Sequence, residues 1–167
     1  MRSLIFSDSH YNLEYLDKMI KEYKPDKIYG LGDYGASEIE LDLRRVIGVR
    51  GNDPFDPQSY GYDYLDEIDG FRILFTHGHK YSVKYGRYRL GLRSRELNVD
   101  VCFYGHTHVV SIEEDKGIYF INPGSISLPS FPNFPTLIIM DSKPNLLDIK
   151  IIDAELNKVY KNIIIKK

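Results

Sequence analysis

The sequence predicts an α/β protein with a substantial antiparallel portion, and three observations support this. Over residues 3–108, short apolar runs alternate with helical or turn-rich segments, as in β-α units. From residue 109 onward, apolar and polar residues alternate as in antiparallel hairpins. No repeat, low-complexity tract or linker divides the chain, so residues 1–167 are expected to form one domain.

The first apolar run, residues 3–8, predicts a buried strand that leads into a helix. In residues 12–23, Leu13, Leu16, Ile20 and Tyr23 share one helical face, and the helix should stop near Pro25. Further strands are predicted at residues 27–33, 45–52, 71–79 and 101–108, with a short, helix-compatible segment at 36–43 and a mixed segment at 81–97. The predicted antiparallel strands lie within residues 109–125, 136–142 and 146–155, with a turn at Asp115 to Gly117.

Composition limits the classes of protein that fit. Apolar residues make up 43% and charged residues 28%, which suits a globular chain with a real core. The net charge of -2 predicts no general attraction to nucleic acid or to an anionic membrane. The single cysteine, Cys102, lies in an apolar run and is expected to be a small buried hydrophobe. No apolar stretch suits a signal peptide or membrane span, so a cytoplasmic, reducing location is expected.

Residues that can hold a metal follow five of the predicted strands. They are Asp8 with His10, Asp33, Asn52, His77, and His106 with His108. In open α/β sheets the functional crevice lies at the carboxyl ends of the strands, so these residues are expected to converge. All five histidines, including His79, fall in these clusters.

Each of these motifs alone also has an ordinary structural explanation. Asp8 to His10 can cap a helix, Asp33 and Asn52 lie in turn-like sequences, and a lone histidine is usually hydrogen-bonded core. Together, carboxylate, amide oxygen and imidazole suit a borderline divalent metal. Seven such groups are too many for one ion but suit two ions that share a carboxylate, so the sequence predicts a two-metal centre.

The motifs and their order resemble the calcineurin-like metallophosphoesterases. The matching motifs are Asp8-x-His10, Gly32-Asp33, Gly51-Asn52, His77-Gly78-His79 and Gly105-His106-Thr107-His108. With the sequence NPGS at residues 122–125, the chain most resembles the YfcE-type phosphodiesterase subgroup. This resemblance implies a two-sheet β-sandwich flanked by helices, with the metals at one sheet edge. By position, Asp8, His10, Asp33 and His108 would hold one ion, and Asp33, Asn52, His77 and His106 the other. Manganese is expected, with iron, zinc and nickel also open.

The chemistry implied by the resemblance is hydrolysis of a phosphate ester. Two ions would clamp the ester and deprotonate a water, whose hydroxide is the nucleophile. His79 could contact the phosphate, donate a proton or pack behind the site. Asp53 departs from the pattern, because many relatives have a histidine there to protonate the leaving oxygen, and an aspartate with an ordinary pKa of about 3.9 is a poor general acid at neutral pH.

Three functions remain open on the sequence. A metal-dependent phosphodiesterase acting on a small phosphate ester is favoured. A nuclease is the runner-up, supported only by the basic segment Lys80 to Arg95, although a solvated helix face explains most of those charges. A protein-binding scaffold that keeps the fold is the third, and a lost ligand or an exposed apolar patch over the crevice would favour it. The physiological ester and the oligomeric state are not predicted.

Overall fold

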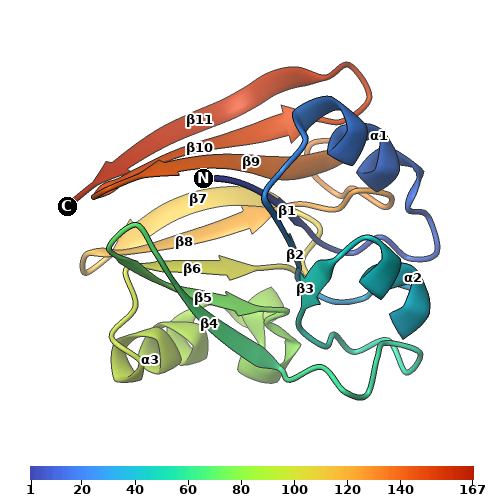
Figure 1. Cartoon of the computed structure of the whole chain (residues 1–167). Coiled ribbons are helices and arrows are strands. Elements are labelled where there is room, and N and C mark those ends of the chain that lie inside the picture. Colours follow the sequence, from blue (N-terminus) through green and yellow to red (C-terminus); the bar gives the residue numbers. More distant parts are fainter.

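The computed structural model describes residues 1–167, and two β-sheets stacked face to face form its centre (Figure 1). The first sheet has the strand order β11-β10-β9-β1-β2-β3, and the second has the order β4-β5-β6-β8-β7. The strands are β1 (Arg2–Phe6), β2 (Lys27–Gly30), β3 (Val46–Gly48), β4 (Asp63–Ile68), β5 (Phe71–Thr76), β6 (Val101–Tyr104), β7 (Val110–Asp115), β8 (Ile118–Pro123), β9 (Thr136–Lys143), β10 (Leu146–Asp153) and β11 (Lys158–Lys166).

Helices cover the outer faces of both sheets. They are α1 (Glu14–Tyr23), α2 (Glu38–Leu43) and α3 (Tyr88–Glu96), with two single-turn 3₁₀ helices, η1 (His79–Tyr81) and η2 (Val83–Tyr85). The predicted amphipathic helix is confirmed as α1, and its Leu16 and Met19 belong to the same buried cluster as Phe6 of β1. On the second sheet, Leu90 of α3 packs in one cluster with Cys102 of β6. No helix is both long enough and apolar enough to cross a membrane.

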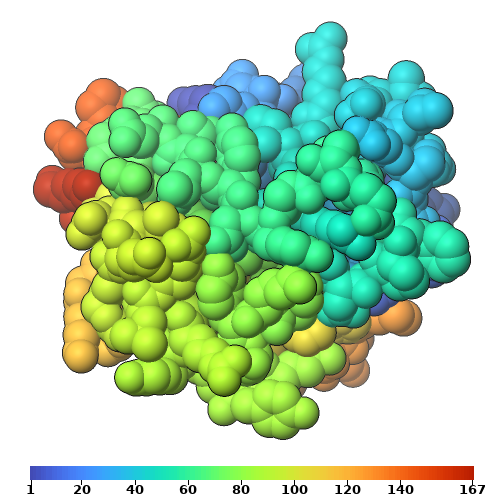
Figure 2. Space-filling view, turned by 90° about the horizontal axis from the view of Figure 1, so that it is seen from below, coloured from blue at the N-terminus to red at the C-terminus, as the bar shows by residue number.

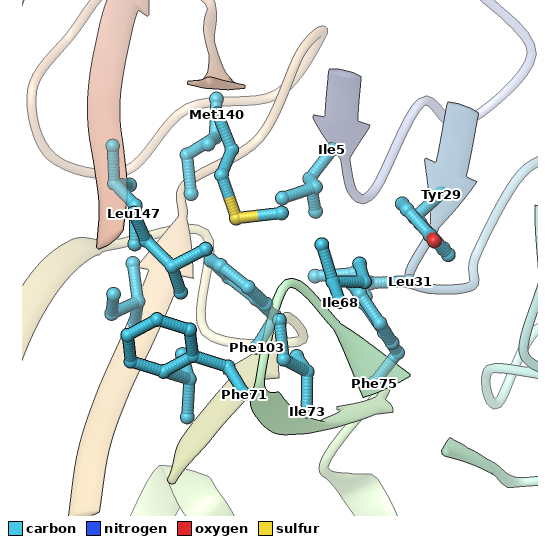
Figure 3. Packing of buried hydrophobic residues seen from close by; sticks show 14 of the residues in the cluster. Ile5, Tyr29, Leu31, Ile68, Phe71, Ile73, Phe75, Phe103, Met140 and Leu147 are labelled. Carbon is cyan, nitrogen blue, oxygen red and sulfur yellow. The ribbon is translucent and has the colours of Figure 1, made fainter. Parts of the chain in front are cut away.

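The main core lies between the two sheets. Ile5 and Met140 of the first sheet point toward Phe71, Phe75 and Phe103 of the second (Figure 3), and each of these side chains is 1% exposed or less. Neighbouring residues along the same strands point outward to the helices, as the two-residue period of a strand requires. Both sheets are therefore buried on two faces along their central strands, which explains their nearly continuous apolar runs.

The central strands run parallel, and this positions the site. β1 pairs with β2 and β2 with β3 in parallel, and β5 pairs in parallel with β6 in the other sheet. The carboxyl ends of these five strands therefore lie at one end of the sandwich. In Figure 1 the arrowheads of β5 and β6 point toward the end of the molecule where β3 and α2 lie.

Two strands escaped the sequence prediction. β4 forms a hairpin with β5 through Asp69 and Gly70, which both have positive φ, and the Asp-Gly pair is a recognisable hairpin signal. β11 is an edge strand in which only Ile165 is buried, so it lacks the alternation that marks a half-buried strand. The other predicted strands are present, although β3 is only three residues long.

Candidate metal centre

The seven predicted ligands meet at the carboxyl ends of strands from both sheets. Asp8, Asp33 and Asn52 follow β1, β2 and β3 of the first sheet, whereas His77 follows β5 and His106 follows β6 of the second. The expectation that the centre lies at the edge of one sheet is therefore corrected, because the strand ends of the whole sandwich supply it. The ligand atoms form two groups, each within 4.8 Å: Asp8 with His10 and His108, and Asp33 with His77 and His106.

Left-handed backbone is concentrated at these residues. Five of the seven have positive φ, with values of 55° at Asp8, 38° at His10, 53° at Asp33, 68° at His106 and 57° at His108. Non-glycine residues in this region cost on the order of 1 kcal/mol or more each, and such strain clusters at functional sites. His106 and His108 therefore lie in a bent loop after β6, not in an extended strand, and each points into a different ligand group.

The first group is built around a buried carboxylate. The Nδ1–H of His108 donates to the carbonyl oxygen of Leu128 over 2.7 Å, which directs its Nε2 into this group. That Nε2 lies 3.1 Å from Oδ1 of Asp8 and 3.2 Å from Nε2 of His10. Oδ2 of Asp8 accepts hydrogen bonds from Ser7 and from the backbone N–H of His106. Oδ1 is buried and has no hydrogen-bond partner.

The second group repeats this arrangement. The Nδ1–H of His77 donates to the carbonyl oxygen of Leu31 over 2.6 Å, so its Nε2 faces the second group. This Nε2 lies 3.1 Å from Nδ1 of His106, 3.2 Å from Oδ1 of Asn52 and 3.4 Å from Oδ2 of Asp33. Oδ1 of Asp33 accepts from the backbone N–H groups that follow β3, at 2.7 and 2.8 Å.

The distances between these ligand atoms, 3.1–3.4 Å, fit bound cations. A cation would bind the neutral rings and would displace the protons that the raised pKa values of His77 and His108 favour in its absence. Two donor atoms bound at about 2.1 Å to one ion lie about 3.0 Å apart in an octahedron and about 3.4 Å apart in a tetrahedron. Together with the orphaned Oδ1 of Asp8, this spacing shows that the residues present fit a divalent cation in each group.

The protonation states in the metal-free site follow from burial and from the paired carboxylates. Burial, reinforced by the nearby His77 charge, lowers the pKa of His106 to about 4, so this ring is neutral at pH 7. Burial raises the pKa of Asp8, but the close contact with His108 and the charges of His77 and His108 outweigh it and leave that pKa below its ordinary value. The Asp8 carboxylate in turn raises the pKa of His108.

His79 and Asp53, the two candidate catalytic residues, lie beside the groups without joining them. The His79 ring is 5.3 Å from that of His77 and 6.1 Å from that of His106, and its buried Nδ1 has no partner. Burial lowers the pKa of His79 to about 4. The Asp53 carboxylate accepts from the backbone N–H of Phe55 over 2.9 Å, so it caps its own turn.

Asp56 is a positioning residue that the sequence reasoning missed. It is 1% exposed, and its two oxygens accept from the backbone N–H groups of Asp33, Tyr34 and Gly51 at 2.7–2.8 Å. One carboxylate thus joins the loops after β2 and β3. The repeated Asp-Pro pairs at residues 53–57 were a signal, but such pairs usually mark exposed turns.

The NPGS sequence at residues 122–125 holds the remaining loops together. Asn122 donates to the carbonyl oxygen of Gly105 and to the hydroxyl of Thr107, and the Ser125 hydroxyl donates to the carbonyl oxygen of Asp8 over 2.8 Å. A Cβ on Gly105 would lie 2.0 Å from the Ser7 hydroxyl oxygen, so glycine is required there. The motif fixes the backbone that carries ligands of the first group.

The basic segment Lys80 to Arg95 is divided among η1, η2 and α3. Arg87 pairs with Glu113, Arg93 with Asp63 and Glu96, and Arg95 with Asp115. Half of the six basic side chains of this segment are therefore neutralised by carboxylates, which favours the interpretation as an ordinary solvated surface. The face seen from below shows this segment (yellow-green) beside the loop after β3 (blue-green), with yellow and orange atoms of later residues visible between them (Figure 2).

The calcineurin-like phosphoesterase superfamily domain matches residues 1–145. The chain belongs to this superfamily. It is 30% identical over 165 residues to the probable metallophosphoesterase YsnB of Bacillus subtilis, covering 95% of each chain. It is 34% identical over 127 residues to the phosphodiesterase YfcE of Escherichia coli, covering 72% of this chain and 61% of YfcE. The resemblance to the YfcE-type enzymes is thus confirmed, and membership indicates a metal-dependent phosphoesterase.

Solved structures confirm the fold. A predicted phosphoesterase from Streptococcus pneumoniae superposes with a TM-score of 0.86 at 23% identity, covering 99% of this chain and 97% of that one. Vps29 from Entamoeba histolytica, complexed with zinc, superposes with a TM-score of 0.77 at 23% identity, covering 99% of each chain. At this identity both likenesses show the two-sheet fold alone.

Proposed function

We propose that this protein hydrolyses a phosphate diester with two divalent cations, and that the whole chain acts as one domain. The observation that supports this most directly is the convergence of histidine nitrogens and carboxylate oxygens into two adjoining groups. Because both sheets contribute ligands, neither sheet alone supplies a complete site. The intact ligand set supports an enzyme.

In this proposal Asp8, His10 and His108 hold one cation, Asn52, His77 and His106 hold the other, and Asp33 is shared. Two cations held by these residues would neutralise the charge of the phosphate and activate a water. Manganese is the ion we propose, with iron, zinc and nickel as alternatives. The carbonyl oxygens of Leu31 and Leu128 fix the tautomers of His77 and His108, which aims each Nε2 at its cation. The neutral His79 ring can donate an N–H to a phosphate oxygen.

Metal stoichiometry tests the bridging assignment. Asp33→Ala is expected to abolish tight binding of both ions and hydrolysis of an activated aryl phosphodiester, because the shared carboxylate serves both groups. The matched control is Asp42→Ala on the exposed side of α2, which should bind two equivalents. Elemental analysis after gel filtration gives the stoichiometry. Two tightly bound equivalents in Asp33→Ala would contradict the assignment.

One observation supports the scaffold alternative. Large apolar side chains are exposed beside the ligand loops: Tyr11 is 67% exposed, Phe55 72%, Leu128 56% and Phe131 59%. Such side chains are common at protein-binding surfaces. A screen of phosphomonoesters, diesters and oligonucleotides with each reloaded metal separates the functions. A scaffold would hydrolyse none of them at a metal stoichiometry of two.

The nuclease alternative has its own test. Neutralising Arg87, Arg89 and Arg93 together is expected to change turnover of small diesters little, because Arg87 and Arg93 already pair with carboxylates. Loss of activity on oligonucleotides alone in this triple variant would favour a nuclease.

A further inference from the structure

A groove of about 950 Å³ runs along the outer face of the second sheet, between α3 and β7. Its floor contains Phe120 and Tyr104, and the Tyr104 hydroxyl lies 2.8 Å from the Ser111 hydroxyl. α3 packs over the centre of the sheet through Leu90. The strip in front of β7 is left open to solvent, and its volume suits a small-molecule ligand.

An Arg-Gly-Arg face of the helix lines one side of the groove. Arg87, Gly91 and Arg95 are four residues apart and therefore lie on the same side of α3. The two arginines reach across to Glu113 and Asp115 of β7 and pair with them. Gly91 lies between them, and a Cβ there would meet only the Arg95 guanidinium, at 3.4 Å or more. The missing side chain leaves the middle of the groove empty.

One end of the groove opens at the candidate metal centre. Thr107, which lies between the ligands His106 and His108, lines the groove, as does Lys84 of η2. A diester whose phosphate sits at the metals can therefore extend one of its two alcohols into the groove.

The lining selects for a planar group with negative charge. The Arg87 guanidinium lies 5.2 Å from the centroid of the Phe120 ring, and Tyr88 at the rim is 76% exposed, so flat surfaces are available for stacking. The two acids of the lining are already paired with arginines, whereas Lys84 and Lys116 pair with no carboxylate. The groove therefore has positive charge in excess.

We propose that this groove binds the non-reacting alcohol of the diester and that this alcohol is a nucleoside with a further phosphate. The proposal rests on the proposed function for its place in catalysis, but the groove and its ligand can be tested separately. The nucleoside ring packs in the space beside Gly91, and the further phosphate faces Lys84.

Three esters with the same p-nitrophenolate leaving group test this assignment. Their other alcohols are methanol, thymidine through its 5′ oxygen, and 3′-phosphothymidine through its 5′ oxygen. In the metal-loaded wild type kcat/KM should rise about tenfold or more from methyl to thymidine, because remote binding energy is used in the transition state, and rise again with the 3′-phosphate. Equal values for all three esters would overturn the proposal.

The variants locate the effect. Gly91→Leu fills the groove and should lose the gain from thymidine, whereas Gly91→Ala adds one methyl group and should keep most of it. Lys84→Gln should lose only the gain from the 3′-phosphate. Lys143→Gln, at the β9–β10 turn, is the matched charge control and should keep both gains. Retention of the thymidine gain in Gly91→Leu would overturn the assignment. If circular dichroism shows that this variant is misfolded, Gly91→Gln replaces it.

A binding measurement separates failure of the groove from failure of the proposed function. Thymidine 3′,5′-bisphosphate is titrated calorimetrically into metal-free protein, and it should bind to the wild type and to Lys143→Gln but not to Gly91→Leu. If no ester is hydrolysed and this binding pattern holds, the groove assignment stands and the phosphodiesterase proposal fails. If esters are hydrolysed and the bisphosphate binds equally to Gly91→Leu, the groove assignment fails alone.

Discussion

The rate of the proposed hydrolysis should depend steeply on the leaving group, because the site holds no effective general acid. With a pKa of about 4, only about one His79 ring in a thousand is protonated at pH 7. A fully protonated general acid contributes about 10²- to 10⁴-fold to the rate. With only one ring in a thousand protonated, the contribution of His79 falls to a factor between about 0.1 and 10. The Asp53 carboxylate caps a turn. Aryl oxides leave without a proton, whereas alkoxides need one.

Asp53→His is the decisive substitution. An ordinary histidine, with a pKa of about 6.5, is about one quarter protonated at pH 7, so it can recover most of the missing catalysis. We expect kcat/KM for alkyl diesters to rise by about 10²-fold and that for aryl diesters to change little. Asp53→Asn, which keeps a side-chain oxygen for the turn and carries no proton to donate, is the matched control and should behave like wild type.

The assay is a series of methyl diesters with leaving groups from nitrophenol to alkyl alcohols, measured at fixed metal and pH 7. A flat dependence in the wild type would refute the reasoning, and if His79→Ala then made it steep, His79 would be the acid. If the rate depends steeply on the leaving-group pKa in the wild type and equally steeply in Asp53→His, the side chain at position 53 points away from the leaving oxygen.

Two further predictions concern stability and metal affinity. Asp56→Ala should lower the free energy of unfolding by about 3 kcal/mol or more and weaken metal binding, because three buried N–H groups lose their charged acceptor. Chemical denaturation measures the stability, and metal titration measures the affinity. Unchanged metal affinity would show that the loops hold their positions without the Asp56 carboxylate. Metal-free protein should be most stable near pH 6.5. His79 and His106 have lowered pKa values of about 4, so protonating them costs stability as the pH falls from about 6.5 to 4. His77 and His108 have raised pKa values, so their contribution to stability is lost as the pH rises above about 6.5. Melting temperatures across pH 4–9 test this, and a maximum near pH 9 would contradict it.

The candidate ligands could be predicted from the sequence because each follows a buried strand directly. Asp33 comes three residues after the end of β2 and His77 one residue after the end of β5, a local pattern that needs no knowledge of the tertiary fold. The division of those strands between two sheets could not be predicted in the same way. β1 pairs antiparallel with β9, more than a hundred residues away, and local periodicity does not determine such a long-range partner.

Residues that support the site were harder to find than the ligands. Asp56 has the same local sequence context as a solvent-exposed turn, and only the folded loops show that its carboxylate is buried. Gly91 lies in the segment expected to form an ordinary solvated helix face, whereas the structure shows that it leaves space between α3 and β7. Both roles arise from segments that meet only after folding.

Because ligands come from both sheets, cations at this centre would act as a cross-link between the two halves of the sandwich. The distances between ligands within each group then depend on the thickness of the apolar layer behind them, where Met140 and Ile5 face Phe103, because each group takes ligands from both sheets. A core side chain distant from the phosphate could therefore tune catalysis by changing how closely the sheets approach. Sequence drift in this interior is constrained by chemistry as well as by folding.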